Sequence, residues 1–410
     1  MRRMQNLEYI FVCTPFFRPR SFELSRLLTL AFDIWEYAAI AYILVGFLYE
    51  LLQGKLKQRK IHAVVYLLGA LKIWEVITAA LNGALYFAKV VECVGTIALA
   101  LYADAMMQKT RTQIVKYLSV LTGILLFINN LSYLYMGSPD YADATGNPIF
   151  FWQTRNHLSS LVFLAMVATY ILLNSHVRRT RGQYLWGTFV FINVLAAEIL
   201  YYSGTRLTGL IAFLVAAFVF KHWRGLWHPK LIAVALLLIN AAIVFLRIQD
   251  IFAGFIENVL HKNLSLTGRT GIWDTALLII AQSPLIGHGT ANIINVSFAE
   301  TTLAAHNQIL ETAIQSGVVG ALLLILLIFM TMAAIAKQGE GGFSRWVCAA
   351  MIGYMVMIIA EGPSPYEPWY IIMCMAFNLS ALNQDFVQRK WQILRNGKLR
   401  RVTITRRGNE

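Results

Sequence analysis

The stretch from residue 268 to residue 320 holds the side chains with the clearest capacity for chemistry. Arg269 opens a segment whose apolar residues, from Ile272 to Ile280, recur at helical spacing, and His306 stands where the chain turns back into an apolar run. An arginine at a helix N-terminus adds a rigid fork of donors to the positive end of the helix dipole, which suits phosphate. A neutral histidine can take a proton from a hydroxyl near pH 7. These residues therefore predict a site that holds an anion and activates a hydroxyl.

A second arginine strengthens this prediction. Arg206 follows Ser203-Gly204-Thr205 at the start of another apolar run. Two arginines at helix starts near one point could hold a pyrophosphate without a metal ion. The alternative is that each arginine snorkels to the membrane surface or pairs with a nearby acid such as Asp274. Because two arginines occur together with His306, we favour a binding role.

Other polar residues have weaker signals. His157 follows Arg155 and Asn156 in a further loop and could line the same cavity, whereas His288, between two glycines, is better explained as a turn residue. No set of His, Asp or Glu has metal-ligand spacing, so no metal site is predicted. The four cysteines stand alone in apolar surroundings, which indicates inert core residues.

The composition predicts an integral membrane protein. Only 14% of the 410 residues are charged, compared with about 25% in soluble domains, and 58% are hydrophobic. The apolar runs are mostly near 20 residues long, as helical membrane spans are, whereas barrel strands would alternate over about 10 residues. The fold class is therefore expected to be all-α, a polytopic membrane protein with about 12 transmembrane helices. The expected spans are 7–17, 27–52, 61–81, 84–106, 114–136, 158–173, 184–202, 207–220, 231–246, 308–336, 346–360 and 369–386.

Most of the 35 Lys and Arg residues lie in short segments between these runs or in the tail, and we place those segments in the cytoplasm. This bias explains the net charge of +14, and no basic run is interleaved with aromatic residues as nucleic acid binding requires. Both termini are then cytoplasmic if 7–17 crosses the membrane. If that short run lies in the interface instead, the N-terminus is outside.

This arrangement divides the chain into four parts. Residues 1–247 form the N-terminal transmembrane helices, 248–306 a large extracytoplasmic catalytic loop with short helices, 307–386 the C-terminal transmembrane helices, and 387–410 a basic cytoplasmic tail. Lys72 with Glu75 and Lys89 with Glu92 lie inside the apolar runs, three residues apart, so mutual pairing is expected. A proton-coupled transporter would also carry such residues, which keeps that class open.

The order of the polar and glycine residues resembles the O-antigen ligase/polymerase superfamily of bacterial envelope glycosyltransferases. The residues that carry this resemblance are Arg269, Trp273, Pro284, Gly287, Gly289, His306, Asn307, Gly317 and Gly320. Arg206 is similar to the family's upstream arginine, and Asn156 to its asparagine in an outer loop. The N-terminal Thr14-Pro15-Phe16-Phe17-Arg18-Pro19, followed by Asp33-Ile34-Trp35, resembles capsule and exopolysaccharide polymerases in particular.

The resemblance implies transfer of a glycan from undecaprenyl pyrophosphate to a sugar hydroxyl, with no nucleotide sugar, metal or other cofactor. The reaction would take place at the outer face of the bacterial cytoplasmic (inner) membrane. His306 would activate the acceptor hydroxyl. Substrate would be bound by Arg206, Arg269, Asn307, Asn156 and His157.

The acceptor distinguishes two possible activities. A polymerase joins the glycan to a second lipid-linked glycan, and an O-antigen ligase joins it to lipid A core. The N-terminal resemblance favours the polymerase. A transporter or flippase for the lipid-linked glycan is the alternative from another class, although the internal repeats common in transporters are not evident.

Overall fold

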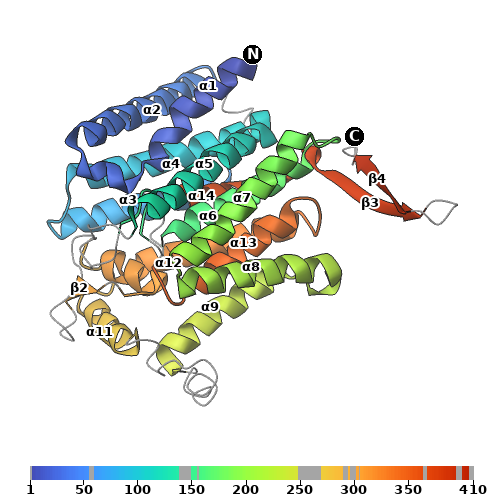
Figure 1. The fold of residues 1–410 in the computed structure, drawn as a ribbon. Helices are drawn as coiled ribbons and strands as arrows, with labels where there is room; N and C mark the ends of the chain where they lie inside the picture. The colour runs from blue at the N-terminus through green and yellow to red at the C-terminus, as the bar shows by residue number, and fades with distance from the viewer. Residues whose placement is uncertain are drawn as a thin grey trace.

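Helices make up nearly all of the described chain, which comprises residues 2–54, 60–137, 149–154, 157–247, 269–289, 294–295, 302–303, 305–362, 367–393 and 399–405. In this computed structural model the long helices run side by side in one bundle (Figure 1). Eight helices are long and apolar enough to cross a membrane: α2 (Arg26–Leu52), α3 (Ala63–Leu81), α4 (Phe87–Thr110), α5 (Thr112–Met136), α7 (Arg181–Leu200), α8 (Gly204–His222), α9 (Pro229–Leu246) and α12 (Gln308–Lys337).

Four of the twelve expected spans correspond to shorter helices. These are α1 (Arg2–Cys13), α6 (Leu158–Asn174), α13 (Ser344–Met357) and α14 (Glu367–Phe377). A helix of 14 residues is about 21 Å long, whereas the hydrocarbon core is about 30 Å thick. α6, α13 and α14 are buried along most of their length, so they face protein rather than lipid. The polytopic helical architecture is confirmed, and the count of twelve spans stays a prediction.

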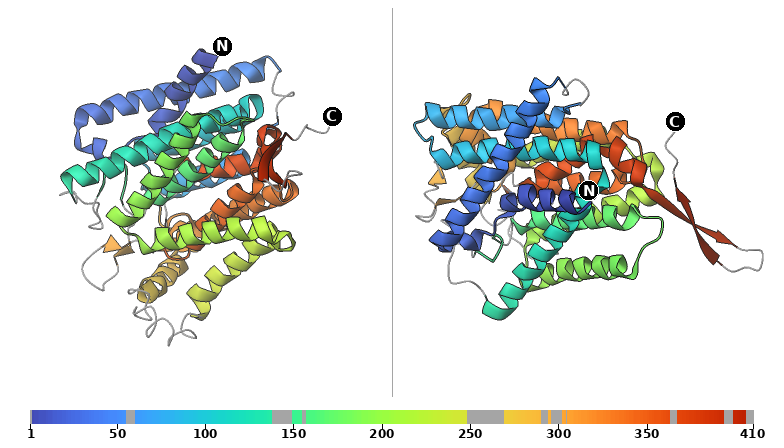
Figure 2. Two further views of the ribbon diagram at one scale, coloured as in Figure 1. Left: turned by 45° about the vertical axis from the view of Figure 1, so that its right-hand side comes forward. Right: turned by 90° about the horizontal axis from the view of Figure 1, so that it is seen from above.

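Two antiparallel pairs of strands depart from the expected all-α fold. β1 (Ile294–Asn295) pairs with β2 (Thr302–Leu303), and β3 (Val387–Ile393) pairs with β4 (Leu399–Thr405). The β3–β4 hairpin projects away from the bundle (Figure 2). It occupies much of 387–410, which was expected to be only a basic tail. Its strands are rich in Val, Ile, Thr and Trp, residues that favour extended backbone.

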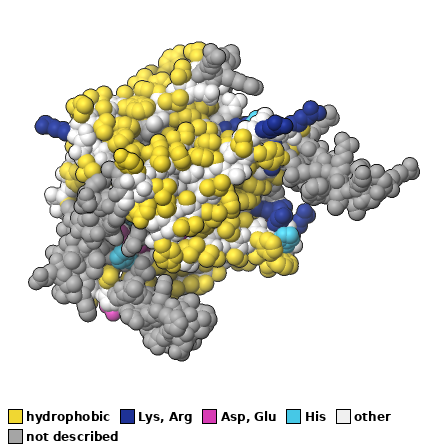
Figure 3. Space-filling model, viewed as in Figure 1, with side chains coloured by type: hydrophobic (Ala, Val, Ile, Leu, Met, Phe, Trp, Pro, Cys, Tyr) yellow, Lys and Arg dark blue, Asp and Glu magenta, His cyan; other side chains and the backbone are white. Residues whose placement is uncertain are grey.

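The surface agrees with a protein that crosses a membrane. A broad hydrophobic belt covers the helices, and most of the Lys and Arg side chains in view gather at the end from which the C-terminal hairpin leaves (Figure 3). Many Leu, Ile, Val and Phe side chains on α2, α7, α8 and α9 are exposed. Such apolar surface would be unfavourable in water and is expected against lipid.

The C-terminal half supplies the helices that matter for the site. α11 (Arg269–Gln282) lies in the large loop expected at 248–306 and packs on α12 through a small apolar cluster that includes Trp273, Ala276 and Ile314. α8 packs closely on α13, where a Cβ placed on Gly209 would lie 2.4 Å from Met357 Cγ. Only glycine allows this approach.

Candidate functional site

His306 lies in the turn that leads into α12, where the sequence predicted it. Its backbone φ is 48°, in the left-handed region that few residues other than glycine adopt. The turn is held by two hydrogen bonds: Ala305 N donates to Glu311 Oε2 at 2.8 Å, and Gln308 N donates to Ile358 O at 3.1 Å. Such conformations persist where surrounding contacts fix them, and they cluster at functional sites.

The His306 imidazole is paired with a carboxylate. Its Nδ1 lies 3.1 Å from Oε1 of Glu361, which follows the end of α13. The Glu361 side chain is 6% exposed and that of His306 is 24% exposed. Because a carboxylate only accepts hydrogen bonds, Nδ1 carries a hydrogen, and in the neutral imidazole Nε2 then keeps a lone pair. This arrangement orients a general base, as a carboxylate does for the histidine of a catalytic triad.

Asn307 holds the start of α12. It is fully buried, and its Oδ1 accepts from two backbone amides of the first helical turn, each at 3.1 Å. Its Nδ2 donates to Asn240 Oδ1 at 3.0 Å and to Ile359 O at 3.2 Å. These bonds make Asn307 an N-cap that positions the neighbouring His306. A direct contact of Asn307 with substrate stays a prediction.

α11 begins at Arg269, as the sequence predicted. Trp273, one turn later, is fully buried, and its Nε1 donates to Ala305 O at 3.0 Å. Residues one turn apart on a helix are separated by about 6 Å, and Ala305 precedes His306 directly. The first turn of α11 is therefore close to the His306 turn. The structure describes Arg269 by its helical backbone alone.

Arg206 lies in the first turn of α8, and its side chain is fully buried. Its Nε donates to Glu198 Oε1 at 2.6 Å. Its Nη2 donates to the carbonyl oxygens of Ala197 at 3.0 Å and Tyr201 at 2.9 Å. The alternative interpretation, pairing with an acid, therefore describes this arrangement, with Glu198 rather than Asp274 as the partner. A role in substrate binding stays a prediction.

The starts of α8, α11 and α12 lie at one end of the bundle. Gly209, in the second turn of α8, contacts Gly353 and Met357 near the end of α13, and Glu361 follows only four residues later to pair with His306. Three helix N-termini at one end bring together three positive dipole ends, which favour an anion.

Three further residues from the sequence analysis are His157, Asn156 and His288. Nδ1 of His157 lies 3.1 Å from Thr154 Oγ1, just before α6. Asn156 lies outside the described residues. A ring nitrogen of His288 contacts Ile279 O at 2.8 Å, so His288 is a turn residue as expected. The substrate-binding roles of His157 and Asn156 stay predictions.

The motif glycines join the loop after α11 to α12. Gly317 interrupts α12 with φ 67°, and a Cβ there would lie 2.1 Å from Leu285 O. Val318 N donates to Pro284 O at 2.8 Å. Gly287 also has a positive φ, and a Cβ on it would clash with the Gly317 backbone. Gly317 therefore packs closely against the loop of residues 283–289.

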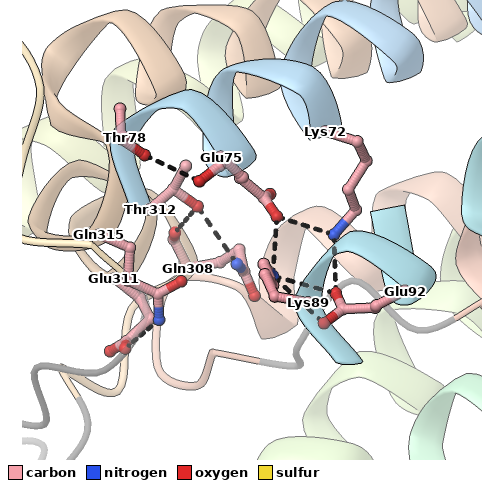
Figure 4. A network of polar contacts seen from close by, with 9 residues as sticks. All are labelled: Lys72, Glu75, Thr78, Lys89, Glu92, Gln308, Glu311, Thr312 and Gln315. Atoms are coloured by element: carbon pink, nitrogen blue, oxygen red, sulfur yellow. Dashed lines mark hydrogen bonds and ion pairs between the residues drawn. The ribbon is translucent and has the colours of Figure 1, made fainter. Parts of the chain in front are cut away.

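The charged residues inside the bundle form one network (Figure 4). Lys72 Nζ lies 3.0 Å from Glu75 Oε2, and Lys89 Nζ lies 3.2 Å from Glu92 Oε1, which confirms the expected pairs. The two pairs also cross, with Lys72 to Glu92 at 3.2 Å and Lys89 to Glu75 at 3.1 Å. Two ammonium groups and two carboxylates thus neutralise each other between α3 and α4.

Sequence reasoning missed Glu361. A signal was present, because this carboxylate directly follows the apolar run at 346–360, at the membrane side where His306 was placed. Only the fold shows that the two residues meet. Within the described ranges, no group of three or more His, Cys, Asp or Glu could hold a metal ion.

Comparison with known proteins fits this geometry. Residues 191–325 match the model of a family described as O-antigen ligase, and this segment contains Arg206, Arg269, His306 and Asn307. An uncharacterized protein of Haemophilus influenzae is 29% identical over 109 residues, which cover 24% of this chain and 27% of the relative. The match thus spans about a quarter of that relative's length. With eight helices able to cross a membrane, the chain is a multi-pass bacterial membrane protein. Over residues 191–325, the chain is thus similar to the family described as O-antigen ligase.

Proposed function

We propose that this protein polymerises undecaprenyl-pyrophosphate-linked oligosaccharide repeat units into surface polysaccharide. The reaction is a metal-independent glycosyl transfer at the outer face of the cytoplasmic membrane. The observation that carries the proposal is the His306–Glu361 pair, at the end of the bundle where α8, α11 and α12 begin. An oriented imidazole beside three helix N-termini suits hydroxyl activation next to a phosphate leaving group. The family match supports transfer of a glycan.

In the proposed reaction, His306 Nε2 takes the proton of the acceptor hydroxyl while the acceptor oxygen attacks the anomeric carbon of the donor. The bond from that carbon to the pyrophosphate oxygen breaks, and undecaprenyl pyrophosphate leaves with the electron pair. Arg206, Arg269 and the helix N-termini stabilise the negative charge on the leaving group. Glu361 stabilises the imidazolium. For Arg206 this role requires exchange of its bond to Glu198 for one to substrate.

The proposal includes twelve spans with both termini in the cytoplasm. Its support is the gathering of Lys and Arg side chains at one end of the hydrophobic belt (Figure 3). Asn383 accepts from Phe343 N at 2.7 Å, so the start of α13 lies at the same end as the C-terminal hairpin. His306 lies near the opposite end of α13, which the proposal places outside.

An O-antigen ligase that transfers the glycan to lipid A core is the second candidate, and the description of the matching family favours it. The polymerase is preferred because the two halves of the N-terminal motif contact each other. Arg18 of the first half is bonded to Asp33 of the second half. The residues that resemble polymerases thus form one structural unit.

Incubating the purified protein with lipid-linked repeat units alone tests the proposal. Polymer growth is expected, and His306→Ala should slow it about 10²–10⁴-fold. His222→Ala, at the far end of α8, is the matched control and should leave the rate unchanged. Product that forms only after lipid A core is added would establish a ligase. An unchanged rate in His306→Ala would contradict the proposed chemistry and favour the transporter.

A further inference from the structure

A polar cavity of about 710 Å³ lies apart from the His306 turn. Its walls come from the segment of η1 (Thr14–Phe17) and η2 (Arg20–Leu24), from α2 and α4, from residues 152–153, and from the start of α14. The turn between α3 and α4 lies next to this cavity. Asn82 in that turn donates through Nδ2 to Gly287 O, in the loop after α11, at 3.3 Å, so the turn lies at the same end of the bundle as α11. The motif that resembles polymerases thus forms one wall of a cavity at the proposed outer end.

The lining combines carboxyl groups with aromatic rings. Its carboxyl groups are those of Glu23, Asp33, Glu36, Glu92 and Glu367. The guanidinium groups of Arg18 and Arg20 are the cations of the lining, so its formal charge is negative. Phe16, Tyr37 and Trp152 add aromatic surface. A negative lining disfavours phosphate and favours a ligand that donates hydrogen bonds.

The arginines of the lining are already engaged. Arg18 pairs with Asp33, and Arg20 Nη1 donates to Gln153 Oε1 at 3.1 Å. In the part of the chain that the structure describes, no other side chain is hydrogen-bonded to the carboxyl of Glu36 or of Glu367. Two carboxyl groups therefore face the cavity as acceptors for a ligand.

Glu92 is a third acceptor, and the charge network fixes its position (Figure 4). Its side chain is 45% exposed, whereas those of Lys72 and Lys89 are 1% and 8% exposed. Both ammonium groups lie 3.2 Å from Glu92 Oε1. Buried cations thus hold a carboxylate at the cavity wall, which leaves part of it open to a ligand.

We propose that this cavity is a glycan subsite, which takes uncharged sugar residues of the substrate while the pyrophosphate binds elsewhere. Sugar hydroxyls donate to fixed carboxylates, and the apolar faces of sugar rings pack against aromatic side chains. The inference rests on the proposed glycosyl transfer. Glu361 and Glu367 are six residues apart, a span of at most about 20 Å, so an oligosaccharide in the cavity can extend to His306.

The test measures binding of the repeat-unit oligosaccharide after mild acid has released it from its lipid pyrophosphate. Titration calorimetry on the purified full chain should detect binding by the wild type. Glu36→Gln with Glu367→Gln should weaken it about 10–100-fold, because each substitution replaces a carboxyl oxygen that can accept a hydrogen bond with an amide NH₂ group that cannot. Glu50→Gln, near the other end of α2, is the matched control and should bind like the wild type. Tyr37→Ala, at an exposed ring of the lining, tests the stacking face separately, and its binding should also weaken.

Further measurements separate this inference from the proposed function. His306→Ala should bind the oligosaccharide normally and fail to polymerise. If His306→Ala polymerised normally while only the cavity variants lost binding, the catalytic proposal would fail and the subsite would stand. Absence of binding by the wild type, or wild-type affinity in correctly folded variants of both kinds, would overturn the subsite. Competition by inorganic pyrophosphate would overturn it as well, because it would show that the anion shares the cavity.

Discussion

His306 and Arg206 each have a carboxylate partner, but the two pairs leave different chemistry available. Glu361 pairs with Nδ1 of His306, so the second ring nitrogen can act on a substrate. Glu198 and two carbonyl oxygens engage Nε and Nη2 of Arg206, whose side chain has no exposure to solvent. The imidazole of His306 therefore keeps Nε2 available for a substrate, whereas the guanidinium of Arg206 also stabilises the fold.

Glu361→Gln should slow polymer growth about 100-fold without unfolding the protein. An amide can present its NH₂ group to Nδ1 and favour the tautomer that protonates Nε2. Initial rates with lipid-linked repeat units measure the effect. Glu340→Gln, near the opposite end of α13, is the control, because Glu340 pairs with Arg345 there. A Glu361→Gln enzyme with the wild-type rate would show that the carboxylate does not orient the base.

Arg206→Met should lower stability as well as rate. It leaves Glu198 as a buried charge without its guanidinium partner, at a cost of about 3–5 kcal/mol. Arg269→Lys should lower the rate alone, because a point charge cannot reproduce the guanidinium fork on a pyrophosphate. Thermal midpoints in detergent and polymerisation rates separate the two effects. Equal thermal midpoints for wild type and Arg206→Met would show that the Glu198 pair does not stabilise the fold.

Among the helices, α12 is the element that joins the parts of the site. Its start is capped by Asn307 beside His306, and its interruption at Gly317 accepts the loop that follows α11. Trp74 Nε1 of α3 also donates to Ser316 O at 2.8 Å, just before the interruption. A disturbance at Gly317 should therefore reach α11 and the His306 turn.

Gly317→Ala should destabilise the protein by about 2 kcal/mol or more. The alanine would need a positive φ, and its Cβ would meet Leu285 O at 2.1 Å. Thermal unfolding in detergent measures the loss, and proteolysis of the loop after α11 reports its release. Gly69→Ala on α3 is the control, since a Cβ there meets nothing within 4 Å. A similar thermal midpoint in both variants would contradict the close packing of α11 and α12.

At the scale of the whole molecule, the two ends of the bundle differ in chemistry. One end has most of the Lys and Arg side chains in view and the projecting β3–β4 hairpin (Figures 2 and 3). The other has the His306 turn and the polar cavity. This asymmetry predicts a fixed orientation in the membrane, with the proposed reaction on the side that receives lipid-linked glycan.

Tags at both termini should be protected from protease in intact spheroplasts, because an even number of spans returns the chain to the cytoplasm. A cysteine placed at Gly137, at the end of α5, should react with an impermeant maleimide from outside. A tag that is cleaved only at the N-terminus would show that α1, with its 12 residues, lies in the interface. Cleavage of the C-terminal tag would contradict the orientation itself.

The sequence alone determined where the helices lie and where the important ones start. The apolar runs expected at 207–220 and 308–336 correspond to α8 and α12, and the side chains of Ser203 and Asn307 cap these two helices. The C-terminal hairpin could also have been predicted, since Asn396-Gly397 separates two runs rich in β-forming residues. The many Lys and Arg residues of this segment fit a basic tail equally well.

Tertiary structure alone decided which side chains meet. The His306–Glu361 pair joins residues 55 positions apart in the sequence. The ion pairs Lys72–Glu92 and Lys89–Glu75 join two helices, and the walls of the polar cavity come from five segments. Local preferences contain no information about such partners. Their meeting depends on how helices pack, and the glycines at 209, 287 and 317 set that packing by permitting backbone contacts that any side chain would prevent.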